Sequence, residues 1–207
     1  MPPNKSPSVI GITGITGSGT STAAKILAEE GGFVISADKL SHELMKMGAG
    51  AYNEIVKSFG EGILCEDGEI DRRALGGIVF GDREKMTLLE GIIHPEVIAR
   101  TQEMIEDSIG MGYKFAVIDA PLLIESGMDK ICTSCWLITA PDSARLERIQ
   151  SRDGITPEMA SRRLKSRQGD SFLRPHAHIV IENSSDIESL RTKVLEALKQ
   201  TPRKEFT

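Results

Sequence analysis

Five short apolar runs stand out along the chain, and each has the length of a buried strand. Valine and isoleucine follow one another in these runs instead of alternating with polar residues, which is typical of parallel strands covered on both faces. The runs are Ser8 to Ile12, Gly32 to Ile35, Phe115 to Asp119, Trp136 to Thr139 and His178 to Ile181. The pattern predicts an α/β protein with a five-stranded parallel sheet.

Segments with helical periodicity lie between or after these runs. They are Thr20 to Glu30, Asp142 to Arg152, Pro157 to Gln168 and Asp186 to Lys199. Pro157 suits the first position of a helix, and Thr156 before it suits the N-terminal cap. Ser185 and Glu188 have the spacing of a capping box. We therefore expect a packed C-terminal helix with Ser185 as its cap.

The stretch between the second and third apolar runs is too long for a single crossover connection. Helical patterns within it cover Leu40 to Met47, Ala51 to Phe59, Arg72 to Phe80 and Arg83 to Met111. We expect a helical insertion at this point. The polar ends, 1–7 and 201–207, show no periodicity and are expected to be frayed tails.

The composition excludes several classes of protein. The chain has 207 residues, of which 40% are hydrophobic and 27% charged, as in an ordinary soluble globular protein. Its net charge of -5 gives no general attraction to nucleic acid or to an anionic membrane. No apolar run approaches the roughly 20 residues that span a bilayer. We expect a cytoplasmic protein with neither nucleic-acid nor membrane partners.

The cysteines do not indicate a disulfide framework. There are three of them, Cys65, Cys132 and Cys135, so an even set of bridges cannot form. Cys132 and Cys135 form a CxxC pair, but no further cysteine or histidine lies near enough in the sequence to complete a zinc site. We interpret the pair as incidental to the adjacent strand, in preference to a metal or redox site.

A glycine-rich turn follows the first apolar run and opens the first helix. It reads Gly14-Ile15-Thr16-Gly17-Ser18-Gly19-Thr20-Ser21 and continues into Thr22. Its position and glycine spacing match a phosphate-binding GxxxxGK[ST] loop, in which backbone N–H groups and the helix N-terminus hold phosphate. Thr20 stands where that motif has its lysine, which normally reaches the β- and γ-phosphates. The alternative is a strand-to-helix turn that binds no ligand.

Past this loop, the order of motifs resembles the dephospho-CoA kinase family from about Val9 to Leu198. The matching segments are Val34 to Asp38, Phe59-Gly60, Asp67-Gly68, Ile70 to Leu75, His94-Pro95, Val117 to Glu125, Arg145 to Asp153 and Ala177 to Asn183. The resemblance implies a P-loop NTPase fold with a helical acceptor-binding insertion and a helical lid. It places the nucleotide-binding core at 8–39, 113–144 and 176–200, the insertion at 40–112 and the lid at 145–175.

The resemblance also implies a reaction, in which the γ-phosphoryl of ATP moves to the ribose 3′-hydroxyl of dephospho-CoA. Asp38 would act as the general base that takes the hydroxyl proton. Ser21 and Asp119 would hold Mg²⁺, directly or through water. For Asp38 and Asp119 the alternative is a helix-capping or solvated carboxylate.

The same resemblance implies further contacts with ATP and with the acceptor. Lid arginines would bind the phosphates of ATP, namely Arg148, Arg152 and Arg163, with Arg148 and Arg152 also catalytic. Acceptor contacts would come from Asp38, Arg72, His94, Leu122 and Leu123. The alternatives are ion pairs with neighbouring acidic residues for the arginines, helix capping or packing for His94, and packing for the two leucines.

Three positions depart from the family pattern. Thr20 replaces the loop lysine, Ser36 replaces the first aspartate of the family's D-A-D stretch, and Arg167 replaces a glutamine. These changes leave two alternatives to an active dephospho-CoA kinase, which are a non-catalytic nucleotide- or CoA-binding protein and a kinase for another small molecule or a nucleoside monophosphate. A monomer or a weak homo-oligomer is expected.

Overall fold

The computed structural model describes residues 8–165 and 169–201, and the side chains of Arg163 and Lys165 fall outside this description. The chain divides into two compact units. The first contains residues up to 35 and from 104 onward, and the second contains residues 36–103. Among the helices within the described ranges, none is long and apolar enough to cross a membrane.

The first unit is built on a parallel sheet. Its strands are β1 (Val9–Thr13), β2 (Gly32–Ser36), β3 (Phe115–Asp119), β4 (Ser134–Thr139) and β5 (Ile179–Glu182), in the order β2-β3-β1-β4-β5. β1 pairs in parallel with both β3 and β4, and β4 pairs in parallel with β5. The predicted five-stranded parallel sheet is therefore confirmed. β2 and β3 lie on one side of β1, and β4 and β5 lie on the other side. Ligands of open α/β sheets bind where the chain switches sides in this way.

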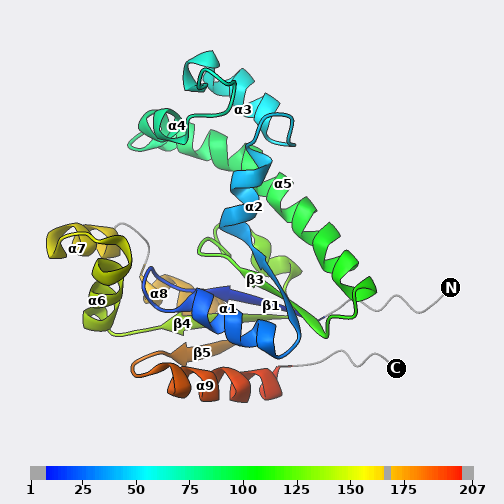
Figure 1. The fold of residues 1–207 in the computed structure, drawn as a ribbon, viewed down its shortest axis with the longest axis vertical. Helices are drawn as coiled ribbons and strands as arrows, with labels where there is room; N and C mark the ends of the chain where they lie inside the picture. The colour runs from blue at the N-terminus through cyan, green and yellow to red at the C-terminus, as the bar shows by residue number, and fades with distance from the viewer. Residues whose placement is uncertain (1–7, 166–168, 202–207) are drawn as a thin grey trace. The chain divides into compact units, whose positions relative to one another are not determined.

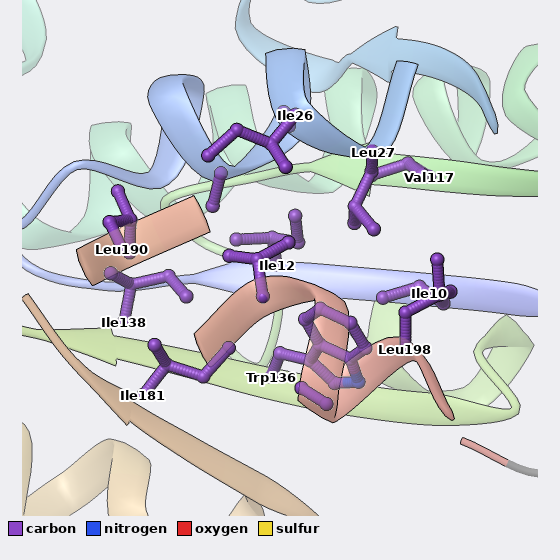
Figure 2. Packing of buried hydrophobic residues seen from close by; sticks show 14 of the residues in the cluster. Ile10, Ile12, Ile26, Leu27, Val117, Trp136, Ile138, Ile181, Leu190 and Leu198 are labelled. Carbon is purple, nitrogen blue, oxygen red and sulfur yellow. The ribbon is translucent and has the colours of Figure 1, made fainter. Parts of the chain in front are cut away.

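Helices α1 (Thr20–Glu29) and α9 (Ile187–Gln200) cover one face of this sheet (Figure 1). Their apolar sides meet the strands in a single core, whose largest fully buried side chain is Trp136 (Figure 2). Core residues drawn there include Ile10, Ile12, Ile26, Leu27, Val117, Ile138, Leu190 and Leu198. Burial of such side chains stabilises the folded state by about 1.5–3 kcal/mol each.

The opposite face of the sheet is covered by the segments that follow β3 and precede β5. They include the 3₁₀ turns Met128–Ile131 and Arg174–His176 and the short helix α8 (Asp170–Leu173). Leu173 packs there against Leu137 and Ile15. β1 approaches this layer so closely that a Cβ on Gly11 would lie 2.6 Å from Cys132 Sγ. The core therefore extends across both faces of the sheet.

The segment after β4 forms α6 (Asp142–Asp153) and α7 (Pro157–Lys165), which cover much of the region 145–175 predicted to be a lid. Pro157 opens α7 as predicted, and Thr156 Oγ1 accepts a hydrogen bond from Met159 N at 3.4 Å. Residues 166–168 of the predicted helix lie outside the described residues. The sequence therefore predicted the start of α7 correctly.

The predicted capping box of α9 is wrong. The cap is Asp186, whose carboxylate accepts from Ser189 N at 2.8 Å, because aspartate is as good a cap as serine and stands one residue closer to the helix. Thr201, which was expected in the C-terminal tail, is buried and its hydroxyl donates to Ala197 O at 2.9 Å. The helix end is thus tied down one residue further than expected.

The second unit is helical, as the periodicity predicted. It contains α2 (Ala37–Leu44), α3 (Tyr52–Phe59), the 3₁₀ turn Glu61–Ile63, α4 (Arg72–Val79) and most of α5 (Arg83–Gly110). Buried side chains on these helices include Leu40, Ile55, Ile63, Leu75, Val79, Ile93 and Val97. Asp71 caps α4 by accepting from the backbone N–H groups of Arg73 and Ala74. The Asp71 side chain therefore serves the helix.

Candidate active site

The glycine-rich loop and Asp119 meet at the carboxyl edge of the sheet. β1 leads into the loop, and Ile12 near its end pairs in register with Asp119, the last residue of β3. Ser21, in the first turn of α1, donates its hydroxyl to Asp119 Oδ2 at 3.1 Å. The two residues predicted to hold Mg²⁺ are therefore brought together.

The backbone of the loop takes the form that its glycines allow. Gly17 and Gly19 have φ angles of 84° and 102°, in the left-handed region that other residues rarely adopt. Gly19 is the N-cap of α1, and its carbonyl accepts from the N–H groups of Thr22 and Ala23. The first N–H groups of a helix have no acceptor within the helix and carry positive potential. The loop thus ends in an anion-binding helix terminus.

Two side chains of the loop bear on phosphate binding. Ser18 is 1% exposed, and its hydroxyl has no hydrogen-bond partner within the described part of the chain. Thr20 is half-buried, and its Cγ2 methyl would lie 3.1 Å from a Cβ placed on Gly14. Thr20 can therefore offer phosphate a hydroxyl, but it lacks the charge of the lysine in the motif.

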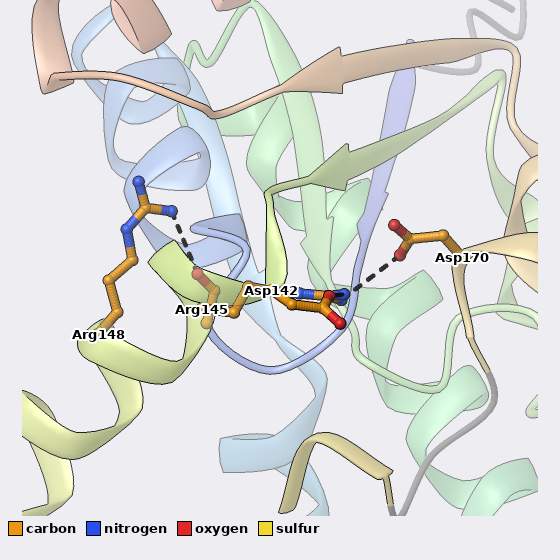
Figure 3. A network of polar contacts seen from close by, with 5 residues as sticks. Asp142, Arg145, Arg148 and Asp170 are labelled. Atoms are coloured by element: carbon orange, nitrogen blue, oxygen red, sulfur yellow. Dashed lines mark hydrogen bonds and ion pairs between the residues drawn. The ribbon is translucent and has the colours of Figure 1, made fainter. Parts of the chain in front are cut away.

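Arg148 of α6 lies against the loop, as Figure 3 shows. Its Nη1 donates to Gly17 O at 3.2 Å, and its Nη2 donates to the carbonyl of Asn183 at 3.3 Å. The charge of Arg148 is therefore fixed next to the phosphate-binding loop instead of pairing with Glu147. This position is compatible with a role in ATP binding.

Arg152 lies one turn further along α6. It forms two hydrogen bonds to the Asp153 carboxylate, at 2.7 and 3.0 Å, and this pairing raises its pKa. An open depression of about 410 Å³ runs along this face of the helix and is lined by Glu147, Arg148, Ser151 and Arg152. The depression is large enough to receive part of a nucleotide.

Arg145 was not among the predicted site residues, yet it is the buried arginine of α6. Its side chain is 10% exposed and pairs with Asp142, while its Nη1 lies 3.8 Å from Asp170 Oδ1 (Figure 3). A Cβ on Gly17 would lie 2.9 Å from the Arg145 carbonyl, so the loop rests directly on this residue. Asp142, three positions before Arg145, was the only nearby residue in the sequence that indicated an ion pair. The other partner, Asp170, is distant in sequence.

The remaining predicted residues of the first unit are placed as follows. Arg163 lies in α7, but its side chain falls outside the described residues, as does all of Arg167. Leu122 is half-buried, and Leu123 is fully buried beneath β1, where its Cδ2 would lie 2.8 Å from a Cβ on Gly11. Packing is thus the evident role of Leu123.

The second unit holds three of the predicted acceptor contacts, namely Asp38, Arg72 and His94. Asp38 is exposed in the first turn of α2, and Arg72 is exposed at the start of α4. His42, one turn after Asp38, was missed, although its i, i+4 spacing from Asp38 places both on one side of the helix. Burial and the positive charge of Arg72 lower the pKa of His42, while Asp38 acts in the opposite direction. Arg72 and Asp38 thus act on the pKa of His42 in opposite directions.

His94 lies well inside α5, where Pro95 is also accommodated. Helix capping, one of the alternatives to an acceptor contact for His94, is therefore excluded, because the helix runs through this position without a break as its periodicity predicted. The side chain is half-buried.

The CxxC pair shows no sign of a metal site. No group of three or more possible metal-ligating side chains occurs among residues 8–165 and 169–201. Cys132 is half-buried and Cys135 is buried, and both are free thiols. A hydrogen bond to Cys135 and burial raise the pKa of Cys132, which keeps it a neutral thiol.

The fold and the carboxyl-edge site together define a class of protein. A glycine-rich loop lies between a central parallel strand and a helix, a carboxylate ends the neighbouring strand, and Arg145 and Arg148 of α6 lie beside the loop. These are the parts of a P-loop kinase, which binds phosphates through the loop and a metal through hydroxyl and carboxylate oxygens.

Comparisons with known proteins define the family more narrowly. The sequence model of the dephospho-CoA kinase family matches residues 8–189. The dephospho-CoA kinase of Carboxydothermus hydrogenoformans is 36% identical over 199 residues, which cover 96% of this chain and 97% of that protein. The chain therefore belongs to the dephospho-CoA kinase family.

Solved structures agree with this assignment. A crystal structure from Thermus thermophilus has a TM-score of 0.79 and 31% identity, with 95% of this chain and 98% of that chain covered. The dephospho-CoA kinase from Campylobacter jejuni has a TM-score of 0.67 and 27% identity, with coverage of 93% and 96%. The likeness extends over almost the whole of each chain.

Proposed function

We propose that this chain transfers the γ-phosphoryl of ATP to the ribose 3′-hydroxyl of dephospho-CoA, forming CoA and ADP. Membership of the dephospho-CoA kinase family supports the reaction, since the family model matches residues 8–189. The observation that carries the proposal in the structure is the hydrogen bond of 3.1 Å between Ser21 and Asp119. It joins the loop hydroxyl to the strand-end carboxylate that a phosphoryl-transfer site requires.

The loop and the first turn of α1 would hold the phosphates of ATP. Main-chain N–H groups of the segment 14–22 supply most of the donors, since the sequence has no lysine at Thr20. Arg148 adds positive charge beside Gly17, and Arg152 and Arg163 would approach the phosphates from the lid. Guanidinium groups suit this role because they can bind phosphate oxygens in pairs.

The Ser21 hydroxyl and the Asp119 carboxylate are hard oxygen donors of the kind that Mg²⁺ prefers, so the residues present fit this ion. When bound, Mg²⁺ would neutralise charge on the β- and γ-phosphates. Ser21 and Asp119 would orient each other through their hydrogen bond and hold this charge at the loop.

The second unit would supply the acceptor contacts. We propose that Asp38 takes the proton of the ribose 3′-hydroxyl, because a carboxylate within hydrogen-bond reach can act as a general base. Arg72 is exposed and would bind a phosphate of dephospho-CoA, and Leu122 would line the acceptor pocket. His94 would be a further acceptor contact of the second unit, whereas Leu123 packs beneath β1 in the first unit.

The setting of the protein is part of the same proposal. We propose a cytoplasmic enzyme that acts on a small molecule, and a net charge of -5 supports the absence of nucleic-acid and membrane partners. We propose a monomer or a weak homo-oligomer.

Mass spectrometry of the products tests the proposed function. The full-length protein is incubated with ATP, Mg²⁺ and dephospho-CoA, and separately with shikimate or AMP as the acceptor. We expect CoA and ADP in equal amounts with dephospho-CoA and no phosphorylated product from the other acceptors. Faster turnover of another acceptor would contradict the proposed substrate, and binding of ATP without any transfer would favour a non-catalytic protein with a degenerate loop.

A further inference from the structure

Asn183 connects three parts of the nucleotide-binding edge. It follows β5 directly and is 7% exposed. Its Nδ2 donates to Ser18 O at 2.8 Å, and its Oδ1 accepts from Arg148 Nη2 at 3.4 Å. Its backbone N–H donates to Thr139 O, at the end of β4, at 2.7 Å. Asn183 is thus fixed to the sheet and reaches the phosphate-binding loop through its side chain.

The bond to Ser18 determines the orientation of a peptide group in the loop. Because a peptide unit is planar and trans, the N–H of Gly19 points away from the side on which the Ser18 carbonyl lies. The hydrogen bond from Asn183 fixes the direction of that carbonyl. It therefore also fixes the direction of the Gly19 N–H, which lies at the N-cap of α1, where we expect phosphate to bind.

The loop and Asn183 are also fitted to each other sterically. A Cβ on Gly19 would lie only 2.4 Å from Asn183 Nδ2. The amide therefore occupies the space that the missing side chain leaves open. Gly19 is required here both for its φ of 102° and for this contact.

The chemistry of the contact requires an amide. The Ser18 carbonyl accepts hydrogen bonds but cannot donate them, and the Arg148 guanidinium donates hydrogen bonds but cannot accept them. The side chain between them must therefore donate at one atom and accept at the other, as asparagine does. Aspartate would keep the contact with Arg148 but would place a charged acceptor against the Ser18 carbonyl.

We propose that Asn183 is a positioning residue for phosphate binding, which holds the Ser18–Gly19 peptide in the orientation that presents the Gly19 N–H to ATP. The inference rests on the proposed function in so far as the loop is taken to bind ATP. Because Thr20 supplies no charge, main-chain donors carry a larger share of phosphate binding than in a loop with lysine.

Equilibrium binding of ATP and of adenosine to the full-length protein tests this role. Asn183→Asp is compared with the natural chain and with Asn53→Asp, a matched change at an exposed position of α3. We expect Asn183→Asp to weaken ATP binding at least tenfold while adenosine binding stays within twofold, and Asn53→Asp to change neither. Adenosine lacks phosphates, so it reports on the remainder of the site.

The outcomes separate the inference from the proposed reaction. ATP binding by Asn183→Asp equal to that of the natural chain, or an equal loss for ATP and adenosine, would overturn the positioning role. If Asn183→Asp does not fold, Asn183→Ser is measured in its place, since serine is neutral but too short to span both partners. Failure of the natural chain to form CoA would overturn the reaction alone, because the binding measurement does not depend on turnover.

Discussion

Thr20 is the single residue that most affects the expected rate. It lies between the backbone cradle of the loop and the Ser21–Asp119 pair, at the point where a P-loop lysine would reach the transferring phosphoryl. A threonine hydroxyl can donate one hydrogen bond but cannot neutralise charge that develops during transfer. We therefore expect phosphate binding by the loop to depend on its N–H groups and on nearby arginines.

Thr20→Lys tests how far the absence of the lysine charge lowers the rate. We expect kcat/KM for ATP to rise by about 10-fold to 10³-fold, since one preorganised donor contributes up to about 10²–10³. The matched control is Thr20→Met, which has similar length and no charge and should not raise the rate. Steady-state kinetics with dephospho-CoA measure the effect. An unchanged rate for Thr20→Lys would mean that an arginine already supplies the charge.

Ser21 and Asp119 should act together on the metal requirement. We expect Asp119→Asn to lower kcat by about 10²-fold and to raise the Mg²⁺ concentration needed for half-maximal rate, because an amide is a weaker ligand than a carboxylate. Glu125→Gln, at an exposed acidic residue after the same strand, is the control and should leave both values unchanged. Titration of activity with Mg²⁺ gives the comparison. An unaltered requirement in Asp119→Asn would contradict a metal role.

At the scale of elements, α6 and α8 are tied by a nearly buried charge. Arg145 on α6 has Asp142 and Asp170 as its partners, and their side chains are 78% and 28% exposed. Loss of Asp170 leaves the guanidinium with one exposed partner. We therefore expect this ion pair to affect the position of α8.

We expect Asp170→Ala to lower the free energy of unfolding by about 1–3 kcal/mol, less than the loss at a fully buried pair because Asp170 is partly exposed. Asp142→Ala should lower it by no more than about 1 kcal/mol, as at exposed pairs. Urea denaturation of both variants gives the two values. Equal losses would show that Asp170 has no special part in holding Arg145.

His42 on helix α2 makes the free energy of unfolding depend on pH. Burial and Arg72 hold the pKa of His42 below its ordinary value of 6.5, so the unfolded chain takes up a proton at this residue more readily than the folded chain. The stability contributed by neutral His42 is complete above pH 6.5 and is lost as the pH falls through the lowered pKa.

His42→Gln should therefore make stability decline less between pH 7 and pH 5. His176→Gln, at an exposed histidine of the other unit, should leave the decline as it is in the natural chain. Thermal unfolding at a series of pH values provides the test. A decline as steep in His42→Gln as in the natural chain would contradict a lowered pKa at this position.

Elements with strong periodicity could be predicted from sequence alone. The third strand agrees residue for residue, and α1 begins at Thr20 as expected, because a continuous apolar run and a glycine-rich turn leave few alternatives. The cap of α9 was misplaced because Ser185 and Asp186 are both good caps and local sequence does not choose between them. The helix around His94 was predicted in spite of Pro95, because the apolar periodicity continues on both sides of the proline.

The candidate site was predictable only where motifs carry it. The loop and Asp119 lie at strand ends, so sheet geometry brings them together once the strands are known. Arg145 with Asp170 and Asn183 with Ser18 could not be predicted, because each pair is joined across the fold and neither has a local sequence signal. Such contacts follow from packing.

For the whole molecule, family membership and the substituted loop both bear on whether the chain is an active kinase. The family model runs from residue 8 to residue 189 and so includes both compact units, the one with the phosphate-binding loop and the one with Asp38. Thr20 is nevertheless a change at the centre of the reaction. The central claim is that the natural chain catalyses phosphoryl transfer with threonine at this position.

The formation of ADP that depends on dephospho-CoA tests this claim most directly. The natural chain, Thr20→Lys and Asp119→Asn are assayed side by side with ATP and Mg²⁺, with and without the acceptor. We predict acceptor-dependent ADP formation by the natural chain, a faster rate for Thr20→Lys and a strongly reduced rate for Asp119→Asn. Absence of acceptor-dependent ADP from the natural chain, with activity appearing only in Thr20→Lys, would contradict the account.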